Sequence, residues 1–264
     1  MKCEKHGRGS YMKLAGKIAI VTGASRSIGA AIAKRYAIEG AKVVVNYRSH
    51  PELAEQVADE IRDRGGEAFV WRADVSQEDE VRLMVEETVR RYGTVDILVN
   101  NAAMDPRQAW HEISAEDWDR VMNVNVKSQF LCAKAVFPYM KAGNYGKIIN
   151  VSSVTFFTGQ KNYVHYVASK GAIIGFTRAL AREVGEHGIN VNCITPGAVY
   201  TETEAEKIGL EASDAAGELL AGLQCLKRRE TTADLEGAFV FLASGDSDFI
   251  TGQTLNADGG WIMH

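Results

Sequence analysis

Two hydrophobic patterns alternate along the chain. Short runs such as 17–22 are largely apolar and β-branched, which is typical of strands buried on both faces of a sheet. Between these runs lie longer segments with apolar residues at helical spacing, as Val81, Val85 and Val89 show within 77–92. The alternation predicts parallel strands that are connected by helices.

This pattern also predicts how the whole chain is organised. No linker, internal repeat or low-complexity segment divides it, so we expect residues 13–264 to form one α/β domain after a disordered extension at 1–12. The expected fold is a single Rossmann-like doubly wound parallel sheet of about seven strands with helices on both faces. The expected strands are 17–22, 41–46, 67–72, 95–99, 147–151, 189–195 and 253–256, and the expected helices are 30–40, 51–64, 77–92, 118–141, 163–187, 203–223 and 232–243.

A glycine-rich turn joins the first strand to the first helix. In this context backbone N–H groups and a helix N-terminus point at a phosphate, although an ordinary tight turn also uses small residues. Polar or glycine-rich residues follow the later strands too, and parallel sheets bind ligands at that edge, so we expect a cleft there with 198–223 as its lid. The turn is Gly23-Ala24-Ser25-Arg26-Ser27-Ile28-Gly29, and the later tails are Asn46-Tyr47-Arg48, Asp74, Asn100-Asn101, Ser152-Ser153 and Thr195-Pro196-Gly197.

Tyr166 and Lys170 lie four positions apart in the expected helix 163–187, so both side chains would lie on one helix face. A free tyrosine titrates near pH 10, and a nearby cation favours the phenolate. The pair is therefore a candidate general acid/base in which the ammonium group lowers the pKa of the phenol. Such pairs also occur on solvated helix faces, so the other motifs decide between the two interpretations.

Composition and charge narrow the classes of function. The formal net charge of −4 gives no reason to expect nucleic-acid binding. No apolar run reaches the roughly 18 residues of a membrane span, and the first eleven residues have no signal-peptide core, so we expect a cytoplasmic protein without a membrane partner. Free thiols and no metal site are expected, because no metal-binding spacing relates Cys3, Cys132, Cys193 and Cys225.

Several motifs occur together in a specific order. They are Thr22-Gly23-x-x-x-Ser27-x-Gly29, Asp74-Val75, Asn100-Asn101-Ala102-Ala103, Asn125, Ser153, Tyr166-x-x-x-Lys170, Pro196-Gly197 and the ending Thr251-Gly252-Gln253…Asp258-Gly259-Gly260. With these motifs, residues 14–264 resemble the classical short-chain dehydrogenase/reductase family. The resemblance implies an NAD(P)-dependent oxidoreductase that transfers hydride between nicotinamide and a carbonyl carbon.

The resemblance also implies a role for each motif. Tyr166 would exchange a proton with the substrate, Ser153 would hydrogen-bond the same oxygen, and Lys170 would lower the pKa of Tyr166 and bind the nicotinamide ribose. Asn125 would hold a water molecule that links Lys170 to solvent. Family members are commonly tetramers assembled through two long helices, so we expect a homotetramer. The implied cofactor contacts are Gly23, Ser25, Arg26, Ser27, Ile28, Gly29, Asn46, Tyr47, Arg48, Asp74, Val75, Asn101, Ala102, Ala103, Tyr166, Lys170, Pro196, Gly197, Val199 and Thr201.

Some neighbouring residues compete for these roles. Ser152 competes with Ser153 and Asn123 with Asn125, but the family spacing favours the second residue of each pair. Tyr163 lies seven positions from Lys170 rather than four, and His165 would point away from the side of Tyr166.

Two positions depart from the family pattern. Ser27 stands where the family has a glycine in the phosphate turn, so its hydroxyl could bond a phosphate oxygen while cofactor binding is weakened. Ala103 stands where glycine is more usual and adds only a methyl group.

The end of the second strand bears on the choice between NADP and NAD. NAD-binding chains usually have an acidic residue there, whereas Asn46 and Tyr47 are neutral. Arg26 and Arg48 are placed to meet a 2′-phosphate, which suits guanidinium geometry, although both could be ordinary surface arginines. We therefore expect NADP, with NAD as the alternative.

The substrate region is expected to be lined by 104–110, 154–163 and the lid. Its apolar and aromatic character favours a ketone or secondary alcohol with a hydrophobic body, although core packing explains part of this character. The alternatives are a 3-oxoacyl-(acyl-carrier-protein) reductase and a non-catalytic dinucleotide-binding regulatory or scaffold protein. The candidate substrate residues are Ser153, Val154, Phe156, Tyr163 and Tyr200.

Overall fold

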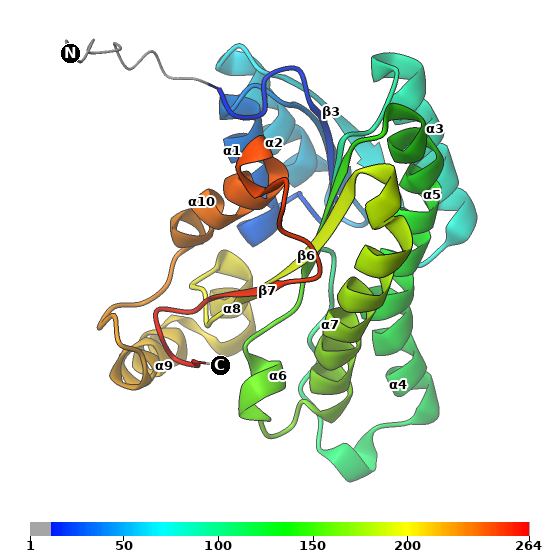
Figure 1. Cartoon of the computed structure of the whole chain (residues 1–264). Helices are drawn as coiled ribbons and strands as arrows, with labels where there is room; N and C mark the ends of the chain where they lie inside the picture. Colours follow the sequence, from blue (N-terminus) through cyan, green and yellow to red (C-terminus); the bar gives the residue numbers. More distant parts are fainter. Residues whose placement is uncertain (1–11, 264) are drawn as a thin grey trace, which may run out of the picture.

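The strands form one parallel sheet, as the hydrophobic pattern predicts (Figure 1). The computed structural model describes residues 12–263, apart from some side chains between 205 and 216, so the expected extension lies almost wholly outside the described residues. The strands are β1 (Ile18–Val21), β2 (Lys42–Tyr47), β3 (Glu67–Arg72), β4 (Ile97–Asn100), β5 (Gly146–Val151), β6 (Ile189–Pro196) and β7 (Thr254–Ala257). They lie in the order β3-β2-β1-β4-β5-β6-β7.

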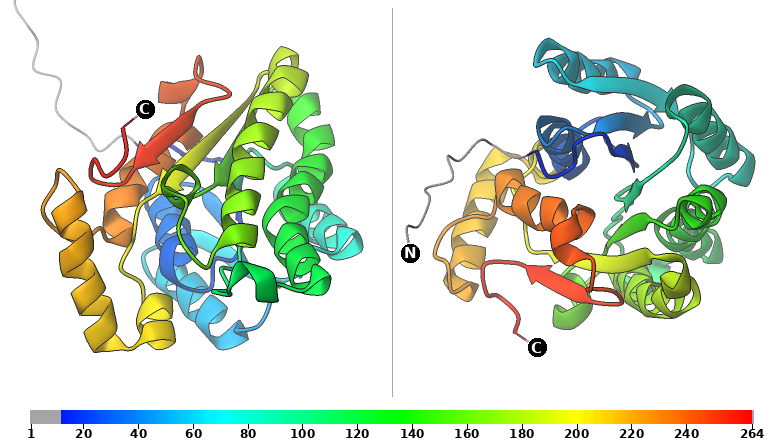
Figure 2. Two further views of the ribbon diagram at one scale, coloured as in Figure 1. Left: turned by 90° about the horizontal axis from the view of Figure 1, so that it is seen from below. Right: turned by 45° about the horizontal axis from the view of Figure 1, so that its top comes forward.

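Helices cover both faces of the sheet (Figures 1 and 2). The α-helices are α1 (Ser27–Ile38), α2 (Pro51–Asp63), α3 (Glu78–Tyr92), α4 (Ala115–Met122), α5 (Ser128–Gly143), α6 (Thr155–Thr158), α7 (Val164–Val184), α8 (Glu202–Ile208), α9 (Leu210–Leu223) and α10 (Thr232–Ala243). One buried cluster contains residues of α1, α2 and α10, and a second contains residues of α3, α5 and α7. Within residues 12–263, no helix combines the length and the apolar character that crossing a membrane requires.

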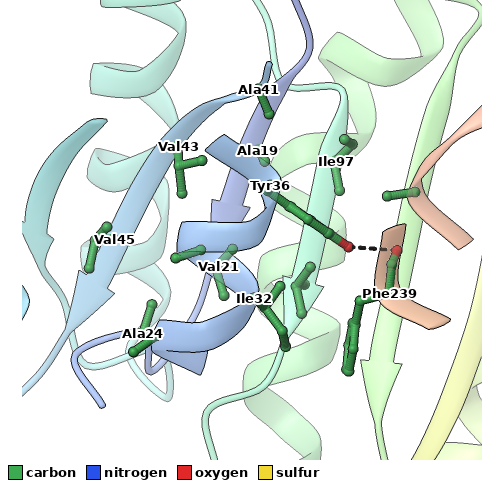
Figure 3. Packing of buried hydrophobic residues seen from close by; sticks show 14 of the residues in the cluster. Ala19, Val21, Ala24, Ile32, Tyr36, Ala41, Val43, Val45, Ile97 and Phe239 are labelled. Carbon is green, nitrogen blue, oxygen red and sulfur yellow. Dashed lines mark hydrogen bonds between the residues drawn. The ribbon is translucent and has the colours of Figure 1, made fainter. Parts of the chain in front are cut away.

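Tyr36 of α1 illustrates how the first cluster is completed (Figure 3). The side chain is fully buried, and its hydroxyl donates a hydrogen bond of 3.0 Å to the carbonyl oxygen of Phe239 in α10. A buried hydroxyl without a partner would destabilise the fold, so this bond allows a large polar side chain to link the two helices. Burial also raises the pKa of the Tyr36 phenol well above its usual value.

The register of the strands brings their carboxyl ends to one level. Val21 of β1 pairs with both Val45 and Val99, and Val151 of β5 pairs with Ile194. The polar tails after these strands therefore meet at one edge of the sheet, as the sequence predicts.

The helix boundaries differ from the prediction in three places. Helix α1 begins at Ser27 rather than Ala30. The expected helix 118–141 begins earlier and is divided into α4, the π-helical segment Asn123–Lys127 and α5. The expected segment 203–223 is divided into α8 and α9 by Gly209, which has a φ of 82°. Hydrophobic spacing does not reveal these breaks, because all three segments keep an approximately helical period.

Candidate active site

The glycine-rich turn after β1 needs glycine at two positions. A Cβ atom at residue 29 would lie 2.4 Å from the carbonyl oxygen of Gly23, and one at residue 23 would lie 3.0 Å from the Cα of Ala102. Ser27 has a φ of 53°, in the left-handed region that favours glycine. The N-cap residue Arg26 makes no capping hydrogen bond with its side chain, so the first N–H groups of α1 could meet a phosphate there.

Two asparagines brace this turn. The Nδ2 of Asn101 donates to the carbonyl oxygens of Thr22 at 2.9 Å and Gly23 at 3.1 Å. The Oδ1 of Asn46 accepts the N–H of Gly23 at 3.1 Å, and its Nδ2 donates to the carbonyl oxygen of Ala73 at 3.2 Å. The side chain of Asn46, which was predicted as a cofactor contact, is buried and holds the turn.

A cavity of about 550 Å³ opens at the ends of β2 and β3. It includes three predicted contacts, Tyr47, Arg48 and Asp74. Sequence reasoning missed Arg72, whose Nε donates to the carbonyl oxygen of Arg48 at 3.4 Å and which also lines the cavity. Its position at the end of β3 was the signal, since the polar tails of the other strands were identified in the same way. The other lining residues are Ser49, Pro51 and Glu80.

Arg26 lies elsewhere, because it contacts the lid. Its Nη1 lies 3.0 Å from the Oε2 of Glu206 in α8. The hydroxyl of Ser27 lies 3.0 Å from the Oγ1 of Thr203 and donates to the Oε2 of Glu202 at 3.3 Å. The lid therefore rests on the phosphate turn, with a carboxylate beside Ser27 that no sequence motif indicated.

Tyr166 and Lys170 lie on the same face of α7, as their spacing predicts. The Nζ of Lys170 lies 5.3 Å from the centre of the Tyr166 ring and donates to the carbonyl oxygen of Val151 at 3.0 Å. The ammonium group is buried, so this bond replaces part of its lost hydration.

The two serines after β5 have different roles. The hydroxyl of Ser152 is buried and donates to the carbonyl oxygen of Lys170 at 2.7 Å, which fixes the strand against α7. The Oγ of Ser153 accepts the hydroxyl of Thr155 at 2.9 Å, and Ser153 also interacts with the phenol of Tyr166. This arrangement favours Ser153 over Ser152 as the hydroxyl that meets a substrate.

The pKa values of the pair are dominated by burial. Burial raises the pKa of Tyr166, the negative charge of Asp105 raises it further, and the contact with Ser153 lowers it. Burial lowers the pKa of Lys170 to about 8. The expected lowering of the Tyr166 pKa is therefore wrong for this structure, because loss of hydration is the largest contribution and outweighs the contact with Ser153.

Asn125 is held in the π-helical segment between α4 and α5. Its side chain is fully buried; Oδ1 accepts the N–H of Met104 at 2.8 Å, and Nδ2 donates to the hydroxyl of Ser169 at 3.0 Å. Asn125 thus joins the loop after β4 to α7. The predicted role as a water holder is not tested by these contacts.

The candidate substrate residues are divided between the core and the surface. Val154 and Tyr163 are buried, whereas Phe156 is 41% and Tyr200 is 39% exposed. The Tyr163 ring lies 5.4 Å from the Tyr166 ring, at an interplanar angle of 62°.

Sequence reasoning missed Arg107, whose Nε donates to the Tyr163 hydroxyl. A single arginine in a loop carries no spacing signal.

The remaining predicted cofactor contacts follow the carboxyl ends of β1, β3, β4 and β6. Ser25 and Ile28 are partly buried in the turn, Val75 is buried, and Ala103 is exposed. Beyond β6, the backbone at Val199 forms a bridge with the buried Glu230. Pro196 ends the strand, Gly197 lies against Glu230, and the Oγ1 of Thr201 accepts the N–H of Glu204.

Comparisons with known proteins agree with this arrangement. Residues 23–262 match a protein family described as enoyl-(acyl carrier protein) reductase. The chain is 38% identical to the 3-oxoacyl-[acyl-carrier-protein] reductase FabG of Staphylococcus epidermidis over 247 residues, 94% of this chain and 99% of the relative.

Solved structures are similar as well. A candidate gluconate dehydrogenase from Agrobacterium tumefaciens is 33% identical with a TM-score of 0.88, over 95% of this chain and 98% of the other. A candidate short-chain alcohol dehydrogenase from Sinorhizobium meliloti is 34% identical, with the same TM-score and coverage of 95% and 98%.

Proposed function

The chain belongs to the classical short-chain dehydrogenase/reductase family, and we propose that it uses NADP(H) to reduce a ketone or to oxidise the matching secondary alcohol. The proposed substrate has a hydrophobic body. The chain is an NAD(P)-dependent oxidoreductase of C=O and CH–OH groups. The observation that supports the proposal is the meeting of Ser153, Tyr166 and Lys170 at one end of β5 and α7.

The pKa directions suit these residues to reduction. Because the pKa of Tyr166 is raised, the phenol is protonated at neutral pH and holds the proton that a carbonyl oxygen must receive. Ser153 can donate a hydrogen bond to that oxygen as negative charge develops. Lys170, whose Nζ bonds to the carbonyl oxygen of Val151, would hold the ribose side of the cofactor and help to replace the proton. When bound, the nicotinamide supplies the hydride.

The cavity beside β2 supports NADP rather than NAD. Arg48 and Arg72 place two guanidinium groups around it, and a 2′-phosphate can accept paired hydrogen bonds from such groups. Asp74 offsets part of this charge, because its Oδ2 lies 3.8 Å from Arg48. Fluorescence titration with NADPH and NADH tests the proposal, which predicts tighter NADPH binding; tighter NADH binding would reverse the assignment.

Tyr166→Phe tests the proton transfer directly. The variant keeps the ring but loses the proton, so turnover of a ketone should fall by about a hundredfold or more, as general acid catalysis typically contributes that much. NADPH affinity should stay close to that of the parent. Tyr92→Phe, at the end of α3, removes a hydroxyl away from the cleft and should retain activity. Full activity of Tyr166→Phe would refute the mechanism.

One other function, reduction of an acyl thioester, has specific support. The FabG relatives favour a 3-oxoacyl thioester as substrate, which acetoacetyl-CoA reduction would test. The third candidate is a dinucleotide-binding scaffold, and it predicts cofactor binding with no turnover of any carbonyl compound. The intact Ser153, Tyr166 and Lys170 argue against that alternative.

We also propose a homotetramer. Trp118 on α4, Phe130 on α5 and Val164 on α7 are 37%, 49% and 47% exposed, and they lie on the helices through which family members commonly assemble. Burying apolar surface of this kind favours association. Sedimentation velocity would give the mass in solution, and a monomer would refute the proposal.

A further inference from the structure

Arg107 lies in a loop that is fastened on both sides. Before it, Met104 exchanges hydrogen bonds of 2.8 and 2.9 Å with the side chain of Asn125. After it, the N–H of Gln108 donates to the carbonyl oxygen of Asn162 at 3.0 Å, immediately before Tyr163. The backbone of Arg107 is therefore held beside the catalytic helix and not on a free loop.

The guanidinium group is directed at the pair of tyrosines. Its Nε donates to the hydroxyl of Tyr163, and its central carbon lies 5.4 Å from the centre of the Tyr163 ring. That ring in turn lies 5.4 Å from the ring of Tyr166. A substrate only a few bonds long could span the distance from the Tyr166 hydroxyl to Arg107.

Arg107 differs from the other arginines of the cleft in its charge balance. Arg26 pairs with Glu206, Arg229 with Glu204, and Arg48 lies near Asp74. No ion pair joins Arg107 to a carboxylate of the residues that the structure describes, and its side chain is exposed. The Nε is occupied by Tyr163, which leaves the outer edge of the planar guanidinium fork as the part that can donate to a further group.

The charges around the site also determine which end of a substrate would lie at Tyr166 and which at Arg107. Asp105, two residues earlier, raises the pKa of Tyr166 and Lys170 through its negative charge. Burial raises the pKa of Tyr163 and Asp105 raises it further, but there the hydrogen bond and charge of Arg107 lower that pKa by more than Asp105 raises it. An anionic group is therefore disfavoured beside the catalytic tyrosine and favoured beside Arg107. The carbonyl group would lie at Tyr166, with the anion at the outer end.

On the basis of this geometry, and resting on the proposed carbonyl reduction, we propose that Arg107 selects substrates that carry an oxyanion at the end remote from the carbonyl group. A guanidinium fork binds such a group through paired, charge-assisted hydrogen bonds. The oxyanion has two sources: the carboxylate of a small oxo acid, or a phosphate of the carrier in an acyl thioester. Tyr163 is a positioning residue, because it fixes the guanidinium without touching the anion.

Two matched substrate pairs test the proposal with NADPH as reductant. 4-Acetylbenzoate and its methyl ester differ in the carboxylate, and acetoacetyl-CoA and acetoacetyl-N-acetylcysteamine differ in the phosphates. The parent should favour the anionic member of at least one pair by about tenfold to a hundredfold in kcat/KM, as expected for a charge-assisted bond. The pair that shows the preference identifies the source of the oxyanion.

Arg107→Gln should abolish this preference while leaving kcat/KM for the neutral member within about twofold. Arg107→Lys should keep part of it, and Tyr163→Phe should reduce it by raising KM more for the anionic member than for the neutral one. Arg82→Gln on α3 removes the same charge from an exposed position and should change neither member. Added salt should lower the preference in the parent but not in Arg107→Gln.

The outcomes separate this inference from the proposed function. Reduction of the neutral members without any preference, or a preference that survives in Arg107→Gln, overturns the role of Arg107 and leaves the reductase assignment intact. No reduction of any of the four compounds by the parent, with NADPH or NADH, overturns both.

Discussion

Glu230 is a buried carboxyl group whose charge state should control stability. Its side chain is 6% exposed, and its Oε2 has no hydrogen-bond partner among the described residues. A Cβ atom at Gly197 would lie 2.5 Å from this oxygen, so the carboxyl group is pressed against the backbone that begins the lid. Its own carbonyl oxygen accepts the N–H of Tyr200 at 2.8 Å.

Burial first, and then the charges of Asp234 and Asp258, raise the pKa of Glu230 from 4.5 to about 8, against opposing contributions from the Gly197 N–H and Arg229. The folded protein therefore binds a proton that the unfolded chain releases. This stabilising effect is complete below about pH 4.5 and is lost as the pH rises through about 8.

Glu230→Gln removes the titration and keeps the size of the side chain. One unit of pKa corresponds to about 1.4 kcal/mol, so between about pH 5 and pH 7 the unfolding free energy of the parent should fall by about 2.5 kcal/mol relative to the variant. Any constant difference between glutamine and glutamic acid cancels when the two pH values are compared.

Urea unfolding followed by circular dichroism at several pH values measures this divergence. Glu183→Gln, at an exposed position on α7, is the matched control and should run parallel to the parent. If the difference between Glu230→Gln and the parent were the same at about pH 5 and pH 7, the carboxyl group would not be protonated in the folded state. The argument from burial would then be refuted.

Two further predictions concern cofactor binding. Arg72→Gln should weaken NADPH binding by about tenfold and leave NADH binding unchanged, because it removes a charged partner of the 2′-phosphate. Fluorescence titration measures both affinities, with the exposed Arg64→Gln as control. An equal loss of affinity for both cofactors would contradict this role. Glu202→Gln should tighten the binding of both dinucleotides by about threefold to tenfold, because it removes a negative charge next to Ser27 where the pyrophosphate is expected. Glu211→Gln, further along the lid, serves as its control, and weaker binding by Glu202→Gln would show that the carboxylate does not compete with phosphate.

Much of the fold and the position of the site followed from local patterns. The β-branched run at 17–22 indicates a buried strand, and the four-residue spacing of Val81 and Val85 indicates a helix. Both patterns follow from the geometry of the element itself. The same holds for Tyr166 and Lys170, whose shared face depends only on helix geometry. Such features are determined within a few residues of chain.

The breaks in the helices were harder to predict from the sequence. Asn125 was identified, but the π-helical segment that carries it was not, because its extra residue per turn barely changes the hydrophobic spacing. Gly209, between α8 and α9, is a recognisable breaker only after the ends of both helices are known.

What the sequence determined by itself was therefore the order of strands and helices, the glycine-rich turn and the shared helix face of Tyr166 and Lys170. The tertiary structure decided where polar side chains point and which charges they meet. Asn46 holds the turn, Arg26 faces the lid, and Arg72 joins Arg48 at a cavity. It also raised the pKa of Tyr166, where the sequence predicted the opposite. The physical reason is that burial and electrostatic partners are supplied by segments distant in sequence, so no local pattern records them.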